Sequence, residues 1–247
     1  SPHWSDRIRV VSDPPVKRRG DDTSGWLVDR IDRSLREARE AVLLVSPYFV
    51  PGEDTTALLV DLAGRGRHVG VVTNSLAAND VVAVHGGYAK YRRPLLAGGV
   101  HLYELRPDAA VGEADAPAAG DGAVANVRPR SGAAGSSGAS LHTKAFLVDG
   151  RRGFIGSYNL DPRSAWLNTE MGVFFDDPGL AADLRAEYLH LAGPALSWKV
   201  GLDDAGRLYW LDAGGDAPTL LRSEPAASRW RRVQAWLFRL LPLESQL

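Results

Sequence analysis

The sequence predicts an α/β/α layered sandwich with a largely parallel central sheet, followed by a small C-terminal hairpin and helix. Three observations support this α/β fold class. Short apolar runs alternate with amphipathic segments along the chain, which is the order of strands and helices in a layered sheet. The run at 41–45 is apolar without interruption, as in a strand buried on both faces. Polar or turn-forming residues follow the runs, which places loops at the strand ends.

The first elements follow a regular order. A helix is expected within 22–41, where Leu27, Ile31 and Leu35 recur on one helical face. A strand at 41–45 then leads into a Ser-Pro loop. The chain continues with a helix at 55–66 that ends at glycines, a strand at 68–74, a helix at 80–99 and a strand at 100–105.

The rest of the chain divides into three parts. Residues 107–140 are mostly Ala, Gly, Ser and Pro, so we expect a flexible insertion that either lies over a site or is an inert surface loop. A strand at 170–175 and a helix at 178–192 then complete a half-domain spanning 1–195. Residues 196–247 should form a hairpin that turns at 204–206 and a helix that stops near Pro242.

Composition excludes several classes of function. The net charge of −1 gives no electrostatic case for a nucleic-acid partner. The absence of cysteine excludes disulfides, thiolate nucleophiles and cysteine-based zinc sites. The six histidines are scattered and no pair has ligand spacing, so we expect no metal and no cofactor.

The stretch at 140–170 carries the chemistry. If 143–149 is a strand, His142 and Lys144 point to the same side, because successive side chains alternate. An imidazole nitrogen can attack phosphorus, and an ammonium can neutralise the phosphoryl oxygens. Asn159 offers an uncharged amide donor, and Glu170 is a candidate to accept the imidazole N–H. The bland alternative is a surface histidine beside a lysine, but chance does not readily supply all the polar residues that follow.

The pattern His142-x-Lys144-x4-Asp149-x6-Gly156-Ser157-x-Asn159 resembles the HKD motif of the phospholipase D superfamily. The resemblance continues through "DPRSAWLNTE". The segments "SPYFVPG", "VHGGYAKYRRPLLAGGVHLYELRP" and "LPLESQL" resemble the second half of bacterial cardiolipin synthases, especially the C-type branch. Nearly the whole chain is covered, and the insertion fits worst. The resemblance therefore implies a phospholipase D-like fold and phosphodiester chemistry on phospholipids.

The resemblance also implies roles for the catalytic set. His142 would be either the nucleophile that forms a phosphohistidine or the acid that protonates the leaving alcohol. Lys144 and Asn159 would hold the phosphoryl oxygens, and Glu170 would orient His142. Asp149 belongs to the motif, but it would be structural and would face away from the substrate.

Four further residues are candidates for substrate binding. Ser157 would add a hydroxyl donor, and Gly156 would let the backbone approach the site closely. Tyr48 follows a strand end, where α/β folds place ligands, although a core position explains it equally well. His85 is interpreted as either a site-wall or a core residue.

One departure from the family matters. The family's active site needs two such motifs, and this sequence has one; the spacing from His85 to Lys90 does not match it. The second HKD half would come from a homodimer or from a missing N-terminal half. The first ten residues resemble the middle of a protein, which favours a fragment.

Several functions follow from these expectations. The leading one is a phosphatidyltransferase that makes cardiolipin from phosphatidylglycerol or a related lipid, peripherally bound at the cytoplasmic side of a bacterial inner membrane. The alternatives are a phospholipase D-type hydrolase, a nuclease acting as a homodimer, and an inactive lipid-binding half-domain. The tail helix, with Trp230, Val233 and Leu237 on one face and arginines elsewhere, suits a membrane interface and packing on its own domain equally well.

Overall fold

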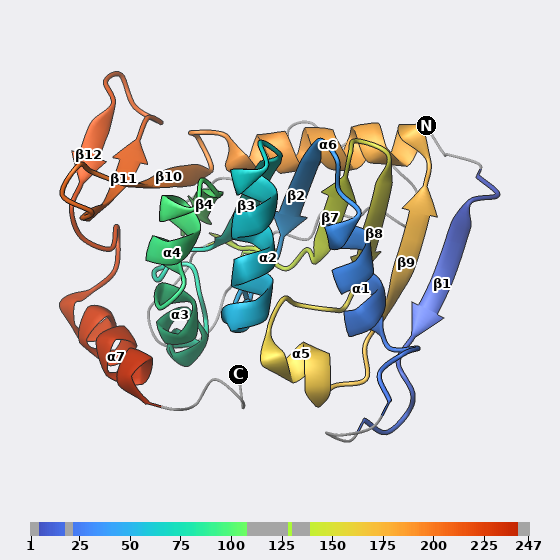
Figure 1. Ribbon diagram of the computed structural model, residues 1–247. Helices are drawn as coiled ribbons and strands as arrows, with labels where there is room; N and C mark the ends of the chain where they lie inside the picture. Colours follow the sequence, from blue (N-terminus) through green and yellow to red (C-terminus); the bar gives the residue numbers. More distant parts are fainter. Residues whose placement is uncertain (1–4, 18–21, 108–127, 130–138, 242–247) are drawn as a thin grey trace.

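The computed structural model describes residues 5–17, 22–107, 128–129 and 139–241. Its centre is a ten-stranded sheet with helices on both faces (Figure 1). Across the sheet the strands lie in the order β1 (Ile8–Ser12), β9 (Met171–Asp176), β8 (Arg152–Gly156), β7 (Ala145–Val148), β2 (Ala41–Val45), β3 (His68–Asn74), β4 (His101–Leu105), β10 (Ser197–Leu202), β11 (Leu208–Asp212) and β12 (Thr219–Leu221).

The α/β class is confirmed, but the expectation of a largely parallel sheet is wrong. Only β2, β3 and β4 run parallel to one another, and every other neighbouring pair is antiparallel. The reason is connection length. A parallel return needs a crossover of a dozen or more residues, whereas three residues, 149–151, join β7 to β8. β8 and this hairpin were not predicted from the sequence.

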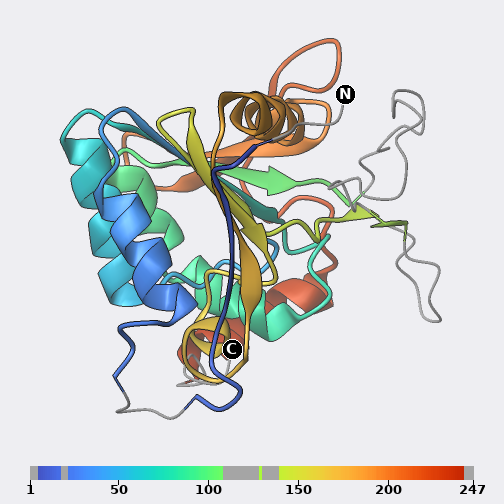
Figure 2. The same cartoon turned by 90° about the vertical axis from the view of Figure 1, so that its right-hand side faces the viewer.

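Two helical layers enclose the sheet. α1 (Leu27–Arg36), α2 (Gly52–Gly64) and α4 (Arg92–Ala97) cover one face, and α6 (Pro178–Ala192) lies across the other (Figure 2). Each face has its own core. In β2, Val42 and Leu44 pack towards α1 and α2, whereas Leu43 and Val45 pack towards α6. Alternate side chains enter opposite cores, which explains the uninterrupted apolar run of this strand.

Most predicted helices are present, with shifted ends. The helix expected at 80–99 is divided into α3 (Val82–Ala89) and α4 by a break at 90–91. The tail helix is α7 (Arg229–Leu240), whose first turn is capped by the Ser228 hydroxyl. A short helix, α5 (Pro162–Trp166), was not predicted; the Asp161 carboxylate accepts a hydrogen bond from the Ser164 N–H at its start, at 2.7 Å.

The C-terminal hairpin is confirmed, with Gly206 at φ +70° in its turn. It continues the main sheet, because β10 pairs with β4. The expected division at 195/196 therefore stays a prediction, and the sheet runs across it. Most of the insertion at 107–140 lies outside the described residues; within it, β5 (Arg128–Pro129) and β6 (Ala139–Ser140) form an antiparallel pair.

Candidate active site

His142 and Lys144 lie at the edge of the sheet where β2 and β3 end. β7 runs antiparallel to β2, so its first residue, Ala145, faces the last residue of β2, Val45. The two motif residues come just before β7 in extended chain, so the expectation that they lie on the strand itself is wrong. The side chains nevertheless alternate: Thr143 is buried between an exposed His142 and a half-buried Lys144. They therefore share the more open side, as the spacing predicted.

Asn74, the last residue of β3, fixes the chain next to His142. Its Oδ1 accepts a hydrogen bond from the Leu141 N–H at 3.0 Å, and its Nδ2 donates to the Leu141 carbonyl at 3.4 Å. The side chain is buried, so water competes little for these bonds. The Asn74 amide thus bonds both backbone groups of Leu141, as a neighbouring strand would in a sheet.

Lys144 sits among carboxylates. Its Nζ donates a hydrogen bond to the His142 carbonyl at 2.8 Å. Burial lowers the pKa of Lys144 below its ordinary value, and the carboxylates of Glu170, Asp161 and Asp80 oppose this shift. The ammonium is therefore partly desolvated, a state in which it would attract a phosphate anion more strongly than in water.

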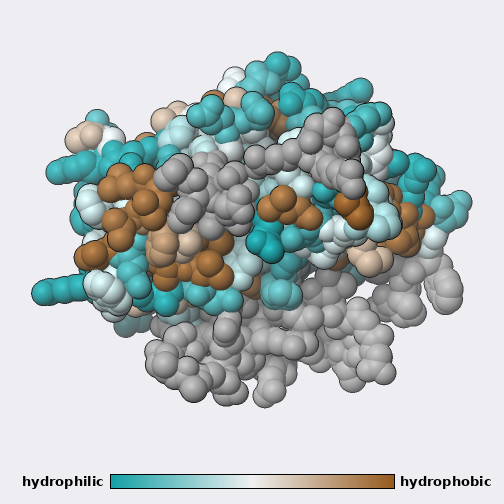
Figure 3. Space-filling view, turned by 90° about the horizontal axis from the view of Figure 1, so that it is seen from below, coloured by the Kyte–Doolittle hydropathy of each residue, from teal (hydrophilic) through white to brown (hydrophobic). Residues whose placement is uncertain are grey.

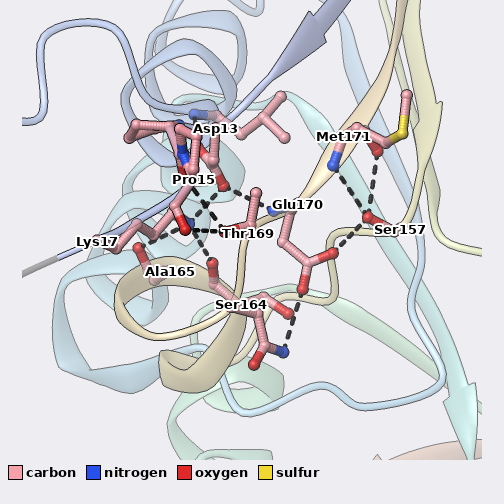
Figure 4. A network of polar contacts seen from close by, with 12 residues as sticks. Asp13, Pro15, Lys17, Ser157, Ser164, Ala165, Thr169, Glu170 and Met171 are labelled. Atoms are coloured by element: carbon pink, nitrogen blue, oxygen red, sulfur yellow. Dashed lines mark hydrogen bonds and ion pairs between the residues drawn. The ribbon is translucent and has the colours of Figure 1, made fainter.

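Glu170 is buried directly before β9, and Figure 4 shows it beside Ser157. Oε2 accepts from the Ser157 hydroxyl, and Oε1 accepts from the Asn168 amide at 3.2 Å. These contacts hold the carboxylate at the end of β8, on the sheet edge that carries His142. The expected hydrogen bond from His142 to Glu170 stays a prediction.

A second set of contacts, centred on Asp13, was missed from the sequence. Asp13 accepts hydrogen bonds from the backbone N–H of Leu27 at 2.8 Å and of Glu170 at 3.1 Å. It also forms a fully buried ion pair with Lys17, whose Nζ donates to the Ser164 carbonyl at 2.8 Å (Figure 4). The N-terminal segment thus ties α1, α5 and Glu170 together. Only the pattern of a lone acid and lysine around two prolines could have signalled this, and it has no specificity.

Asn159 lies in the loop between β8 and α5. Its backbone N–H donates to the Ser164 hydroxyl at 3.2 Å. Its side-chain Oδ1 is buried and has no hydrogen-bond partner among the described residues. An unsatisfied buried amide oxygen is costly, and only a hydrogen-bond donor can satisfy it. Burial also raises the pKa of the neighbouring Asp161 above its ordinary value.

Asp149 lies at the opposite end of β7, away from His142. Its carboxylate accepts hydrogen bonds from the backbone N–H groups of Arg39, Glu40 and Ala41 at 2.8–3.1 Å. Burial raises the pKa of Asp149, but these amides outweigh it and hold the pKa below its ordinary value. The expectation that this motif residue pairs within the protein is confirmed.

Two other candidates contact the protein in informative ways. The Tyr48 hydroxyl donates to Asp80 at 2.7 Å, beyond the end of β2. Gly156 is needed for strand packing: a Cβ there would lie 2.4 Å from the Met171 carbonyl oxygen and 2.6 Å from the Phe154 ring. Close contact between strands therefore explains this glycine, whereas the sequence suggested close approach to a substrate.

His85 belongs to the core, and a role in substrate binding is not supported. It is completely buried, and its Nε2 lies 3.5 Å from a carboxylate oxygen of Glu224. Glu224 also pairs with Arg92, which bonds Glu104 at 3.2 Å. Burial opposes the Arg92 charge, but the two carboxylates outweigh it and raise the pKa of the guanidinium. The helical pattern around His85 could not reveal a partner more than a hundred residues away.

No described part of the chain brings together three His, Asp or Glu side chains suited to a metal ion. A cavity of about 670 Å³ lies between α1, α2 and α5, but it is not lined by His142 or Lys144. The expected cleft around these two residues therefore stays a prediction.

Comparison with known proteins identifies the family. Residues 31–192 match the family model described as "Cardiolipin synthase, PLD-like domain". The chain is 38% identical to cardiolipin synthase C of Escherichia coli over 98% of its own length and 48% of that protein. It is 32% identical to cardiolipin synthase A of Salmonella arizonae over 60% of its length and 24% of that relative.

Solved structures agree on the fold. Nuc from Salmonella typhimurium, a phospholipase D family member, superposes with a TM-score of 0.51 at 15% identity and covers 74% of this chain and 91% of its own. Phosphatidylserine synthase from Haemophilus influenzae gives the same TM-score at 14% identity, covering 93% of this chain and 43% of its own. The chain belongs to the phospholipase D-like family of cardiolipin synthases. It spans about half the length of cardiolipin synthase C.

Proposed function

We propose that this chain is one half of a phosphatidyltransferase that exchanges phosphodiesters on phospholipids. Its product would be cardiolipin, made from phosphatidylglycerol or a related lipid. The observation that carries the proposal is the shared orientation of His142 and Lys144 at the carboxyl ends of β2 and β3. The 38% identity to cardiolipin synthase C supports the choice of lipid.

The chemistry assigned to these residues is a double displacement without a cofactor. A ring nitrogen of His142 attacks phosphorus, and the bond from phosphorus to the leaving alcohol oxygen breaks. Lys144 and Asn159 hold the non-bridging oxygens, and Glu170 accepts the other ring N–H to fix the tautomer. The hydroxyl of a second lipid then attacks phosphorus and gives its proton to the base that had protonated the first leaving alcohol, and the bond from phosphorus to the His142 nitrogen breaks.

The leaving alkoxide needs a proton, and His142 cannot both attack and donate it. A second histidine must therefore come from the other HKD half, supplied by the remaining part of a longer protein or by a homodimer. His142 could equally be the acid, with the partner histidine as nucleophile. The proposed setting is the cytoplasmic side of a bacterial inner membrane, peripherally bound.

Three alternatives use the same fold. Water as acceptor would make the protein a hydrolase that releases phosphatidic acid. A nuclease reading is disfavoured by the net charge of −1, since a nucleic-acid backbone calls for a basic groove. A half-domain that binds lipid without turnover is the third.

The test measures phosphatidyl transfer from phosphatidylglycerol at several protein concentrations and, in parallel, the native mass of the protein. The chain alone should show little or no transfer, and adding the other half of a cardiolipin synthase C should restore it, because acid–base assistance is worth about a hundred- to ten-thousand-fold. If a chain shown to be monomeric turns over the lipid, and His142→Ala abolishes this turnover, the proposal that one chain holds only half of the active site is refuted. Phosphatidic acid as the only product, or no turnover once both halves are present, would refute the transferase.

A further inference from the structure

α7 packs on the protein with Ala235 inwards and most of its large apolar residues outwards. The inner side of α7 packs against α3, and Ala235 of α7 is buried there. A Cβ added at Gly86 of α3 would lie 2.9 Å from Phe238 Cβ and 3.0 Å from the Ala235 carbonyl oxygen. The two helices therefore approach closely at a glycine and an alanine, with Phe238 beside them.

Polar bonds fix the same inner side. The Arg231 guanidinium donates to the carbonyls of Leu76, at 3.0 Å, and Asn79. The Arg232 guanidinium donates to the Glu224 carbonyl at 2.7 Å. The orientation of α7 about its axis is thus set by hydrogen bonds and close packing, so its exposed side is a fixed surface.

That exposed side is apolar. Trp230 is 68% exposed, Trp236 60% and Leu240 62%. We define the outer face of α7 as Trp230, Val233, Trp236, Leu237, Leu240 and Leu241, which are six of the fourteen exposed large apolar residues in the described part of the chain. Figure 3 shows apolar side chains gathered at the left of the lower surface, where α7 lies. A contiguous apolar face of this kind marks an interaction surface.

The charge of α7 favours a lipid partner. The helix carries four arginines and no acid, although the whole chain has a net charge of −1. Arg229 and Arg239 are exposed, one near each end of the helix. Tryptophan and leucine beside arginine suit the boundary between acyl chains and anionic headgroups. No described helix is long and apolar enough to span a bilayer.

The position of the outer face relates it to the site. α5 and α7 both lie at the lower end of the molecule, towards which β2 and β3 run (Figures 1 and 2). Leu167, directly after α5, is 45% exposed and adds a second apolar point at this end. A flat bilayer that touched both α7 and Leu167 would face the edge of the sheet that carries His142.

We propose that the outer face of α7 docks on the surface of an anionic phospholipid bilayer and holds the edge bearing His142 towards it. The choice of a phospholipid partner rests on the proposed function, but the docking does not require turnover. Docking would place the site next to its lipid substrate at the membrane, so the two would not have to meet by long-range diffusion.

The experiment measures flotation of the 247-residue chain with vesicles of equal phosphatidylglycerol and phosphatidylcholine, and with phosphatidylcholine alone. The unmodified chain should bind the anionic vesicles more tightly. Leu237→Glu should weaken binding about tenfold or more, since burying one leucine is worth at least that factor. Leu189→Glu is the matched control: Leu189 is 50% exposed on α6, across the sheet, and its substitution should change nothing.

The outcomes separate the possibilities. Circular dichroism should be unchanged in both variants, because both side chains are exposed; a Leu237→Glu variant that misfolds is replaced by Arg229→Ala with Arg239→Ala, which should lose binding to anionic vesicles. Equal binding by the α7 variants and the unmodified chain would overturn the proposal. A Leu237→Glu variant whose native mass changes while its flotation does not would also overturn the proposal, because the outer face would then bind a protein partner. Binding without turnover would overturn only the proposed transferase.

Discussion

The two ends of β7 differ in what surrounds them, although one short motif supplies both. At one end, the Asp149 carboxylate is held by three backbone N–H groups of the segment that leads into β2. At the other end, His142 is exposed and Lys144 is half-buried among carboxylates. The motif thus joins a structural end to the proposed reactive end, about one strand apart. Substitutions at the two ends should therefore separate stability from activity.

The largest effect should come from His142→Ala. With the second half present, transfer should fall by about a hundred- to ten-thousand-fold or more, because the attacking or proton-donating group is gone. The unfolding free energy should change by less than about 0.5 kcal/mol, since the side chain is exposed. Turnover of phosphatidylglycerol and thermal unfolding measure the two. His190→Ala, another exposed histidine, is the control and should leave both unchanged.

Lys144→Met should reduce transfer by roughly a hundred- to a thousand-fold, because a charge that stabilises the phosphoryl group is lost. Stability should hold or rise slightly at neutral pH. Burial lowers the pKa of Lys144, so the protonated lysine destabilises the folded state. This destabilisation is present below the folded-state pKa and disappears as pH rises towards the higher pKa of the unfolded chain. Urea unfolding at pH 7 and pH 10 tests this, and a variant that unfolds more easily at pH 7 would contradict it.

Asp149→Ala should reverse the pattern. The unfolding free energy should fall by about 1.5–3 kcal/mol, since charge-assisted hydrogen bonds to the backbone are lost and alanine must adopt φ +53°. Because the folded-state pKa is lowered, the stabilisation is fully present above the unfolded value of about 3.8 and disappears as pH falls through the folded value.

Asp149→Asn is the matched variant for that experiment. Asparagine tolerates the positive φ and keeps one acceptor oxygen, so the loss should be smaller, about 1 kcal/mol. Denaturant unfolding from pH 7 to pH 3 should show the difference from the unmodified chain shrinking with acid. A pH-independent difference would mean that the carboxylate charge is not what holds the segment before β2.

The smallest effect is expected from Asn74→Ala. It removes the amide that bonds both backbone groups of Leu141, so transfer should drop several-fold to about tenfold through a displaced His142. Asn79→Ala is the control, because Asn79 is also buried but bonds the Val81 N–H. Comparable stability losses with an activity loss in Asn74→Ala alone would establish the positioning role; equal activity would exclude it.

The sequence predicted what depends on local pattern. β2, β3 and β4, the hairpin turn at Gly206 and the shared side of His142 and Lys144 follow from periodicity and spacing. The fold class followed from alternating strands and helices, and the inward pairing of Asp149 came from the family resemblance. The antiparallel half of the sheet was missed because β8 contains two glycines in a short run with little strand signal.

Contacts between distant residues could not be predicted. The link from Asp13 to Glu170 spans 157 positions, and the bond from Asn74 to Leu141 spans 67. His85 was placed in the substrate-binding set because its nearest sequence neighbours gave no hint of Glu224. Tertiary structure alone decides whether an isolated polar residue is a ligand or a buried partner.

The cluster of Arg92, Glu104 and Glu224 has an evolutionary consequence. Arg92 is buried between the two carboxylates, which come from β4 and from the segment before α7. Removing Arg92 leaves two carboxylates without their shared cation, at a cost of about 3–5 kcal/mol, whereas removing one glutamate leaves Arg92 paired with the other. An apolar trio of similar volume could nevertheless fold well, because all charges would leave together. The three positions are thus epistatic: a neutral residue at position 92 should be tolerated only after both glutamates have been replaced.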